Sequence, residues 1–184
     1  MKLSNVVTRL ALAASIGILG LGCEKAGPVE TADALAEGPQ LIKLPPSNAL
    51  RKVVSVTERI TVRDGGQLAI NTFGQWPFVV ASLTFPKRAV SQDVDITMTL
   101  DDQTLAFDFD PDGISFSKPA MLDVYARGLD LSGVPPWKKV KLFYCDGGQW
   151  VEMKTGRVSA NAWTGELSCD NGEIPHFSRY AFGY

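Results

Sequence analysis

The stretch VDITMTL (94–100) alternates apolar and polar side chains at every position. Its apolar members are Val94, Ile96, Met98 and Leu100. Successive side chains of an extended chain point to opposite faces, so this pattern puts one set on each face. We therefore expect a β-strand with one face on a core and the other in solvent.

The same period of two recurs in TLAFDF (104–109) and in KKVKLFY (138–144). Turn signals separate the alternating runs: DGG at 64–66, PDG at 111–113, PP at 135–136 and DGG at 146–148. From residue 53 onward no segment shows a convincing helical period. About ten short strands in one region of this size predict an all-β fold, an antiparallel β-sandwich over residues 53–184.

The first 22 residues differ in composition from the rest of the chain. Lys2 and Arg9 form a positive start, and an apolar run of 13 residues follows from Leu10 to Gly22. A membrane-spanning helix needs about 20 apolar residues. We therefore expect residues 1–22 to be a signal peptide.

The end of this segment, LGC, resembles the lipobox of bacterial lipoproteins. The resemblance implies lipidation of Cys23, which becomes the new N-terminus and tethers the chain without spanning the membrane. The domain is then expected on the extracytoplasmic side of a membrane in a bacterial cell envelope. An ordinary signal peptide cut near Gly22 is the alternative. Residues 23–52, rich in Ala, Pro, Gly and Glu, are predicted to be the lipidated cysteine and a disordered tether.

The chain has three cysteines. With Cys23 assigned to lipid, Cys145 and Cys169 remain, and an oxidising compartment favours a disulfide between them. Such a bridge would add about 3 kcal/mol in the chain-entropy model. Two separate buried thiols are the alternative, since spacing alone does not establish pairing.

Several stretches resemble, in order, a ZU-5 domain (zonula occludens/Unc-5), and the whole resemblance covers residues 53–184. They are GGQLAI (65–70), VVASLTFPKRAV (79–90), DVDITMTL (93–100) and FDPDGISFSKPAMLDV (109–124). The last carries the most specific pattern: Pro111, Gly113, Phe116, Lys118, Pro119 and Leu122. The resemblance implies an all-β sandwich used mainly for contact between proteins, without a cofactor. The family's partner surfaces do not carry over, because no partner-binding motif matches.

The triplet His176-Phe177-Ser178 contains the single histidine of the chain. It matches the self-cleavage motif of one branch of the ZU-5 family, which implies that Ser178 attacks the Phe177 carbonyl and His176 takes the proton. These residues also belong to a stretch from His176 to Tyr184 in which side chains alternate with a period of two. We expect a regular final strand there, with a structural triplet and an uncut chain. Self-cleavage between Phe177 and Ser178 is the alternative.

Asp108, Asp110 and Asp112 occupy alternate positions before Gly113, like the start of a calcium loop. The twelfth position of a helix–loop–helix calcium loop needs a bidentate glutamate, and here it is Pro119. We therefore predict no metal site and keep a looser calcium site as a weak alternative. Trp137 and Trp163 lie near turn signals, which leaves a glycan-binding surface open as well.

These observations predict an envelope lipoprotein with a protein-interaction or scaffolding module. Its expected partners are the membrane, through Cys23, and a protein of unknown identity. The formal charge of −2 and the lack of a lysine- or arginine-rich run argue against a nucleic acid partner. The alternatives are a self-cleaving domain, and a calcium- or glycan-binding adhesion module.

Overall fold

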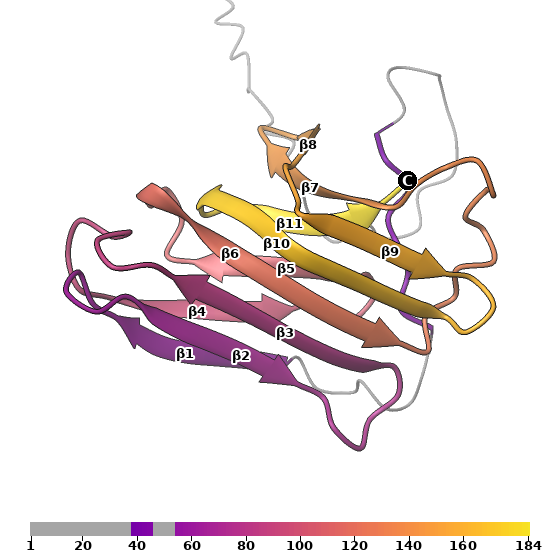
Figure 1. Cartoon of the computed structure of the whole chain (residues 1–184), viewed down its shortest axis with the longest axis horizontal. Coiled ribbons are helices and arrows are strands. Elements are labelled where there is room, and N and C mark those ends of the chain that lie inside the picture. Colours follow the sequence, from indigo (N-terminus) through magenta and orange to yellow (C-terminus); the bar gives the residue numbers. More distant parts are fainter. Residues whose placement is uncertain (1–37, 46–53) are drawn as a thin grey trace, which may run out of the picture.

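A computed structural model describes residues 38–45 and 54–184 (Figure 1). The predicted signal peptide (1–22) and Cys23 lie outside the described residues. The described part of the chain contains strands and no helix. Its eleven strands form two antiparallel sheets that pack face to face, so the predicted all-β sandwich is confirmed.

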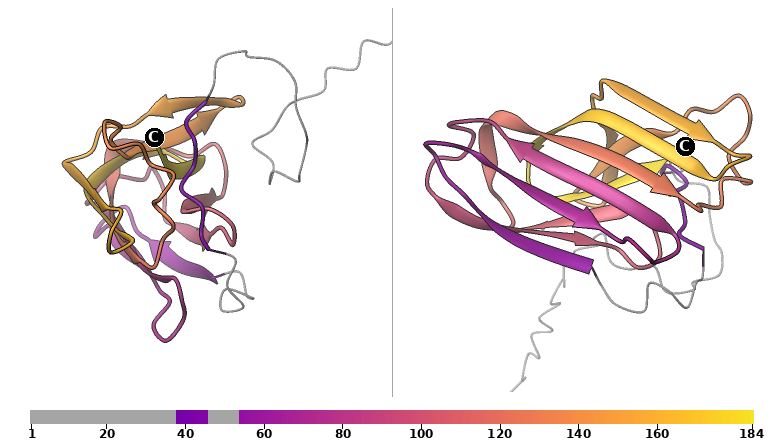
Figure 2. Two further views of the ribbon diagram at one scale, coloured as in Figure 1. Left: turned by 90° about the vertical axis from the view of Figure 1, so that its right-hand side faces the viewer. Right: turned by 60° about the horizontal axis from the view of Figure 1, so that its bottom comes forward.

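The two sheets contain six and five strands. The six-stranded sheet has the order β1 (Val54–Ile60), β4 (Val94–Leu100), β5 (Ala106–Asp110), β11 (Arg179–Gly183), β7 (Lys141–Asp146) and β8 (Gln149–Glu152). The five-stranded sheet has the order β2 (Gly66–Asn71), β3 (Phe78–Phe85), β6 (Ser115–Arg127), β10 (Glu166–His176) and β9 (Arg157–Asn161). The second view in Figure 2 shows the two layers from another side.

The alternating stretch 94–100 forms β4, as predicted. Ile96, Met98 and Leu100 are buried in the core between the sheets. On the opposite face the Thr97 hydroxyl is 2.7 Å from that of Thr57 on the neighbouring β1. The period of two thus separates core contacts from cross-strand hydrogen bonds.

Residues 38–45 correct the prediction of a tether over residues 23–52. The backbone N–H of Ile42 donates to the Phe182 carbonyl (2.8 Å), and the Ile42 carbonyl accepts from the N–H of Leu105 (2.8 Å). Ile42 and Leu44 are buried in the core. The expectation of a tether was wrong here because LIKL (41–44) carries a short alternation whose apolar side chains fill the end of the sandwich. Residues 23–37 and 46–52 lie outside the described part of the chain.

The expectation of one regular strand from His176 to Tyr184 was also wrong. β10 ends at His176 in the five-stranded sheet, and β11 begins at Arg179 in the six-stranded sheet. Phe177 and Ser178 carry the chain from one sheet to the other. Phe177 is buried against the rings of Phe109 and Phe116, at centroid distances of 5.5 and 4.9 Å. Burial of this ring between the layers accounts for the break.

A partly buried ion pair lies next to this crossing. Arg179 Nη2 is 2.7 Å from Asp101 Oδ2, and Arg179 Nη1 is 3.0 Å from Asp108 Oδ2. The side chains of Arg179 and Asp101 are 14% and 3% exposed. The other carboxylate oxygen of Asp101 accepts the backbone N–H groups of Gln103 (2.8 Å) and Thr104 (2.7 Å). Both carboxylate oxygens of Asp101 therefore accept hydrogen bonds, which offset the cost of burying its charge.

The pKa values of the two aspartates move in opposite directions. Burial favours a higher pKa for Asp101, but hydrogen bonds from Arg179 and from the two backbone N–H groups outweigh it and hold the pKa below its ordinary value. Burial raises the pKa of Asp108 despite its pairing with Arg179. We assign the stabilising effect of the pair to Asp101, which is the more deeply buried and the better hydrogen-bonded of the two.

Replacing the arginine should destabilise the sandwich most at neutral pH. Arg179→Met leaves the Asp101 carboxylate without its counter-charge, and we expect a loss of about 3–5 kcal/mol of unfolding free energy. A group with a depressed pKa stabilises the fold above its unfolded pKa, which is about 3.9 for aspartate, and loses that effect in acid. Denaturant unfolding of both proteins should show the difference shrink as the pH falls towards about 3. A constant difference would contradict the assignment.

Candidate functional site

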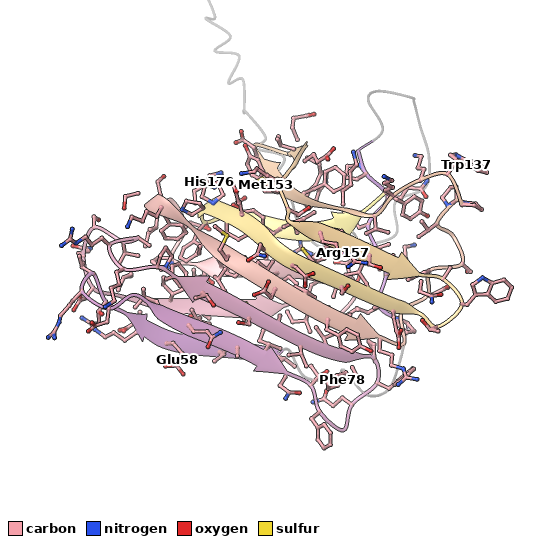
Figure 3. The ribbon with its side chains drawn as sticks, in the orientation of Figure 1. Glu58, Phe78, Trp137, Met153, Arg157 and His176 are labelled. Carbon is pink, nitrogen blue, oxygen red and sulfur yellow. The ribbon has the colours of Figure 1, made fainter. Side chains whose placement is uncertain are left out.

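The predicted self-cleavage triplet lies at the crossing between the sheets. His176 is at the end of β10 away from the loop that carries Trp137 (Figure 3). The Ser178 hydroxyl donates to the Cys145 carbonyl on β7. The His176 imidazole packs edge-on against Tyr144, at 4.8 Å between centroids, and its Nδ1 is 3.4 Å from the Phe177 carbonyl oxygen. The hydroxyl and the imidazole thus contact different partners, which favours a structural role.

The three aspartates of the weak calcium alternative do not form a site. Asp108 pairs with Arg179, Asp110 ends β5, and Asp112 lies in the following turn. Within residues 38–45 and 54–184, no group of three His, Cys, Asp or Glu side chains is placed to hold a metal ion.

The predicted Cys145–Cys169 disulfide is wrong, because Cys169 is a free and buried thiol. Cys169 faces the core between the sheets. On β7 the core-facing side chains are Leu142 and Tyr144, so the alternation of the strand turns Cys145 to the outer face of its sheet. The two side chains therefore lie on opposite sides of a packed layer. Cys23 lies outside the described residues.

A groove of about 700 Å³ lies on the outer side of β7 and β8. Four parts of the chain line it: the segment 38–40, the two strands, the loop between β6 and β7, and Tyr184 at the C-terminus. Its lining residues are Gly38, Pro39, Gln40, Trp137, Lys138, Lys139, Lys141, Phe143, Gln149, Trp150, Glu152 and Tyr184. We call this the tryptophan–lysine groove.

Aromatic rings and lysines dominate the tryptophan–lysine groove. Trp137 is 82% exposed, whereas Trp150 is half-buried and packs so closely on Gly38 that a Cβ there would lie 3.2 Å from its ring. Lys141 pairs with Glu152 at 2.6 Å, and the Lys138 ammonium lies 6.0 Å from the centre of the Tyr184 ring. With three lysines and one glutamate in its lining, the groove suits a ligand that carries negative charge and an aromatic or apolar surface.

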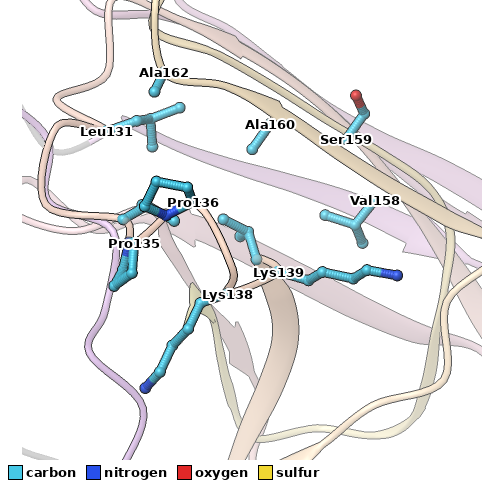
Figure 4. A pocket seen from close by; sticks show the side chains of 11 residues that line it. Leu131, Pro135, Pro136, Lys138, Lys139, Val158, Ser159, Ala160 and Ala162 are labelled. Atoms are coloured by element: carbon cyan, nitrogen blue, oxygen red, sulfur yellow. The ribbon is translucent and has the colours of Figure 1, made fainter.

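A second cavity, of about 400 Å³, lies on the other side of the same loop (Figure 4). Leu131, Pro135 and Pro136 lie along one side of it, and Val158, Ala160 and Ala162 of β9 and the turn after it line another. Lys138 and Lys139 line both hollows and point in different directions. The stretch PPWKK (135–139) thus supplies a wall common to both.

Sequence reasoning did not find the tryptophan–lysine groove. It placed Trp137 near a turn, but segment 38–40 was expected to be part of a tether, and nothing pointed to its contact with Trp150. The available signal was the run WKK (137–139) after two prolines, which joins an aromatic residue to two cations in a loop.

Comparison with protein-family models, with curated proteins and with solved structures found no match for this chain. The ZU-5 resemblance therefore stays a prediction that rests on the motifs quoted above.

The Cys169 thiol should resist modification in the folded protein. Burial, and next the negative charges of Asp170 and Asp123, raise its pKa to about 12, so almost no thiolate forms at neutral pH. Alkylation followed by peptide mapping should show the Cys169 peptide unmodified in the native state and modified after unfolding. Cys169→Ala identifies the peptide. Rapid alkylation of the native protein would contradict the buried position.

Removing the Ser178 hydroxyl should affect stability and leave the covalent chain unchanged. Ser178→Ala abolishes the hydrogen bond to the Cys145 carbonyl, at a cost of about 1 kcal/mol of unfolding free energy. Intact mass under denaturing conditions should show the uncut C-terminus in the wild type and in the variant. A major wild-type species ending at Phe177, absent from Ser178→Ala, would instead establish the self-cleavage alternative.

Proposed function

We propose that this protein is a lipid-anchored lipoprotein of a bacterial cell envelope whose ZU-5-like sandwich binds a partner protein. The observation that best supports the binding role is the tryptophan–lysine groove. It combines exposed and half-buried indole rings with lysines on a rigid sheet. Aromatic side chains of this kind carry much of the binding energy in protein interfaces.

The location of the groove suits an extended and acidic segment of the partner. β8 is the last strand of the six-stranded sheet, so one of its edges is not paired within that sheet. Extended peptides bind at such edges through backbone hydrogen bonds and place alternate side chains in neighbouring pockets. Lys138 and Lys139 would attract acidic residues, while Trp137 would cover an apolar one.

The anchor in this proposal rests on residues 1–23 of the sequence. No helix in the described part of the chain is long and apolar enough to span a membrane. A lipid at Cys23 would hold the domain at the membrane surface, and the described chain enters the sandwich at Gly38, in the wall of the groove.

A glycan is the second candidate ligand. Trp137 and Trp150 line the same groove together with the Gln149 amide, and sugars stack on indole rings while amides bind their hydroxyls. The lysines favour the acidic protein segment, because an uncharged sugar has no negative charge with which to pair. The self-cleaving alternative has less support, since Ser178 and His176 contact other groups.

Photocrosslinking in intact cells tests the binding module. A benzophenone amino acid in place of Gln149 should crosslink to a protein, and the added substitution Trp137→Ala should abolish the adduct. Trp137 is so exposed that this change should alter stability by no more than about 0.5 kcal/mol. The same probe at Arg63, in the exposed turn between β1 and β2, is the matched control. An adduct that is removed by glycosidases would favour a glycan as the ligand. Equal adducts with the probe at positions 149 and 63 would refute the groove as the binding site.

A further inference from the structure

Two hairpins project from the same end of the five-stranded sheet. The β2–β3 hairpin turns between Asn71 and Phe78, and the β9–β10 hairpin turns between Asn161 and Glu166. Phe78 and Glu166 both pair with Arg127, the last residue of β6, from its two sides. Both turns therefore reach the same end of the sandwich, which the first view of Figure 2 shows end-on.

The two turns are built in the same way. The Asn71 side-chain oxygen accepts the backbone N–H of Phe73 at 2.9 Å. The Asn161 side-chain oxygen accepts the backbone N–H of Trp163 at 3.0 Å. In each case an asparagine fixes the backbone of an aromatic residue two positions later. We call Phe73 and Trp163, with these turns, the aromatic tips.

The aromatic side chains are not needed to form these turns. The asparagine binds only the backbone N–H of the aromatic residue, so almost any residue would serve there. Yet Phe73 is 85% exposed and Trp163 is 98% exposed. Each ring is thus held in water and gains little for the fold. Single exposed apolar side chains are common on protein surfaces, so what points to a contact surface is that two such rings are presented at the same end of the sandwich.

The aromatic tips also lack charge. Neither NTFGQWP (71–77) nor NAWTG (161–165) contains a charged residue. At the opposite end of the sandwich the β1–β2 turn contains Arg63 and Asp64. The uncharged tips could enter an apolar or interfacial phase without desolvating an ion, which is the costly step for a charged loop.

The described chain begins at this same end. The backbone groups of Gln40 and Tyr184 exchange two hydrogen bonds of 3.1 Å, and the C-terminus lies at the end where the two hairpins turn (Figure 1). Gly38 follows Cys23 by 15 positions. Fully extended, that length of chain spans at most about 50 Å. A lipid on Cys23 would therefore leave the aromatic tips within reach of the bilayer.

We propose that the aromatic tips insert into the interface of the lipid bilayer to which the protein is anchored. Aromatic rings are favoured at the level of the lipid headgroups, where an apolar body meets a polar environment. Two insertion points and one lipid tether fix the orientation of the sandwich on the membrane. The inference relies on the proposed lipid anchor for its geometry and goes beyond it by assigning a contact surface.

Fluorescence quenching by brominated lipid tests this contact. The full protein, isolated from cell membranes, is reconstituted into phosphatidylcholine–phosphatidylglycerol vesicles with brominated acyl chains. We expect quenching of the wild type, and Trp163→Phe should reduce it, leaving the part that comes from Trp76 in the other turn, which is 52% exposed. Trp150→Phe makes the same change at a half-buried ring of the groove and should retain it. Phe73→Ser should weaken the quenching, because the two tips bind one surface.

Flotation of the same vesicles separates the two proposals. Protein that floats without quenching would overturn insertion and leave the anchor intact. Protein that does not float would refute the anchor. In that case the protein is mixed with excess vesicles, and quenching that depends on Trp163 would still support insertion, whereas its absence would overturn it. Equal quenching in Trp163→Phe and the wild type would also overturn the proposed insertion of the tips. Thermal unfolding should show that every variant is folded.

Discussion

The structure depends on the point near the C-terminus where the chain crosses from one sheet to the other. Phe177 fills the space between the layers there, stacked on Phe109. β11 then enters the middle of the six-stranded sheet, between β5 and β7. Its last residues pair with the segment 38–45, so this late strand also positions the part of the chain that lines the groove. Arg179, the first residue of β11, is fixed by Asp101.

The same crossing also determines what the histidine–serine pair contacts. A sandwich whose chain changes sheets needs polar contacts for the backbone at the crossing. Ser178 donates to the carbonyl of Cys145, and the Tyr180 hydroxyl donates to the carbonyl of His176 at 2.7 Å. These bonds tie the crossing to β7 and to β10. The Ser178 hydroxyl, which looks catalytic in the sequence, thus satisfies a backbone carbonyl of the neighbouring strand.

The two proposed contact surfaces lie towards one end of the molecule and differ in chemistry. The tryptophan–lysine groove joins indole rings to cations beside a sheet edge, which suits an acidic chain. The aromatic tips are uncharged and project from hairpins, which suits a lipid interface. Trp137 belongs to the first surface and Trp163 to the second, although both were expected near turns from the sequence alone. A domain oriented by its tips would present the groove near the membrane.

The sequence by itself determined the class of fold and the strands with a clear alternation, because alternation at period two is a local property that such a strand needs in order to bury one face. β4 is the clearest case. Only the tertiary structure decided which strands share a sheet, and with it the outcome for the cysteines: Cys169 faces the core, while Cys145 faces outward from the other sheet. It also brought Gly38 to Trp150 and Phe73 to the same end as Trp163. Such long-range neighbours leave no periodic signal, since their contact depends on the path of the whole chain.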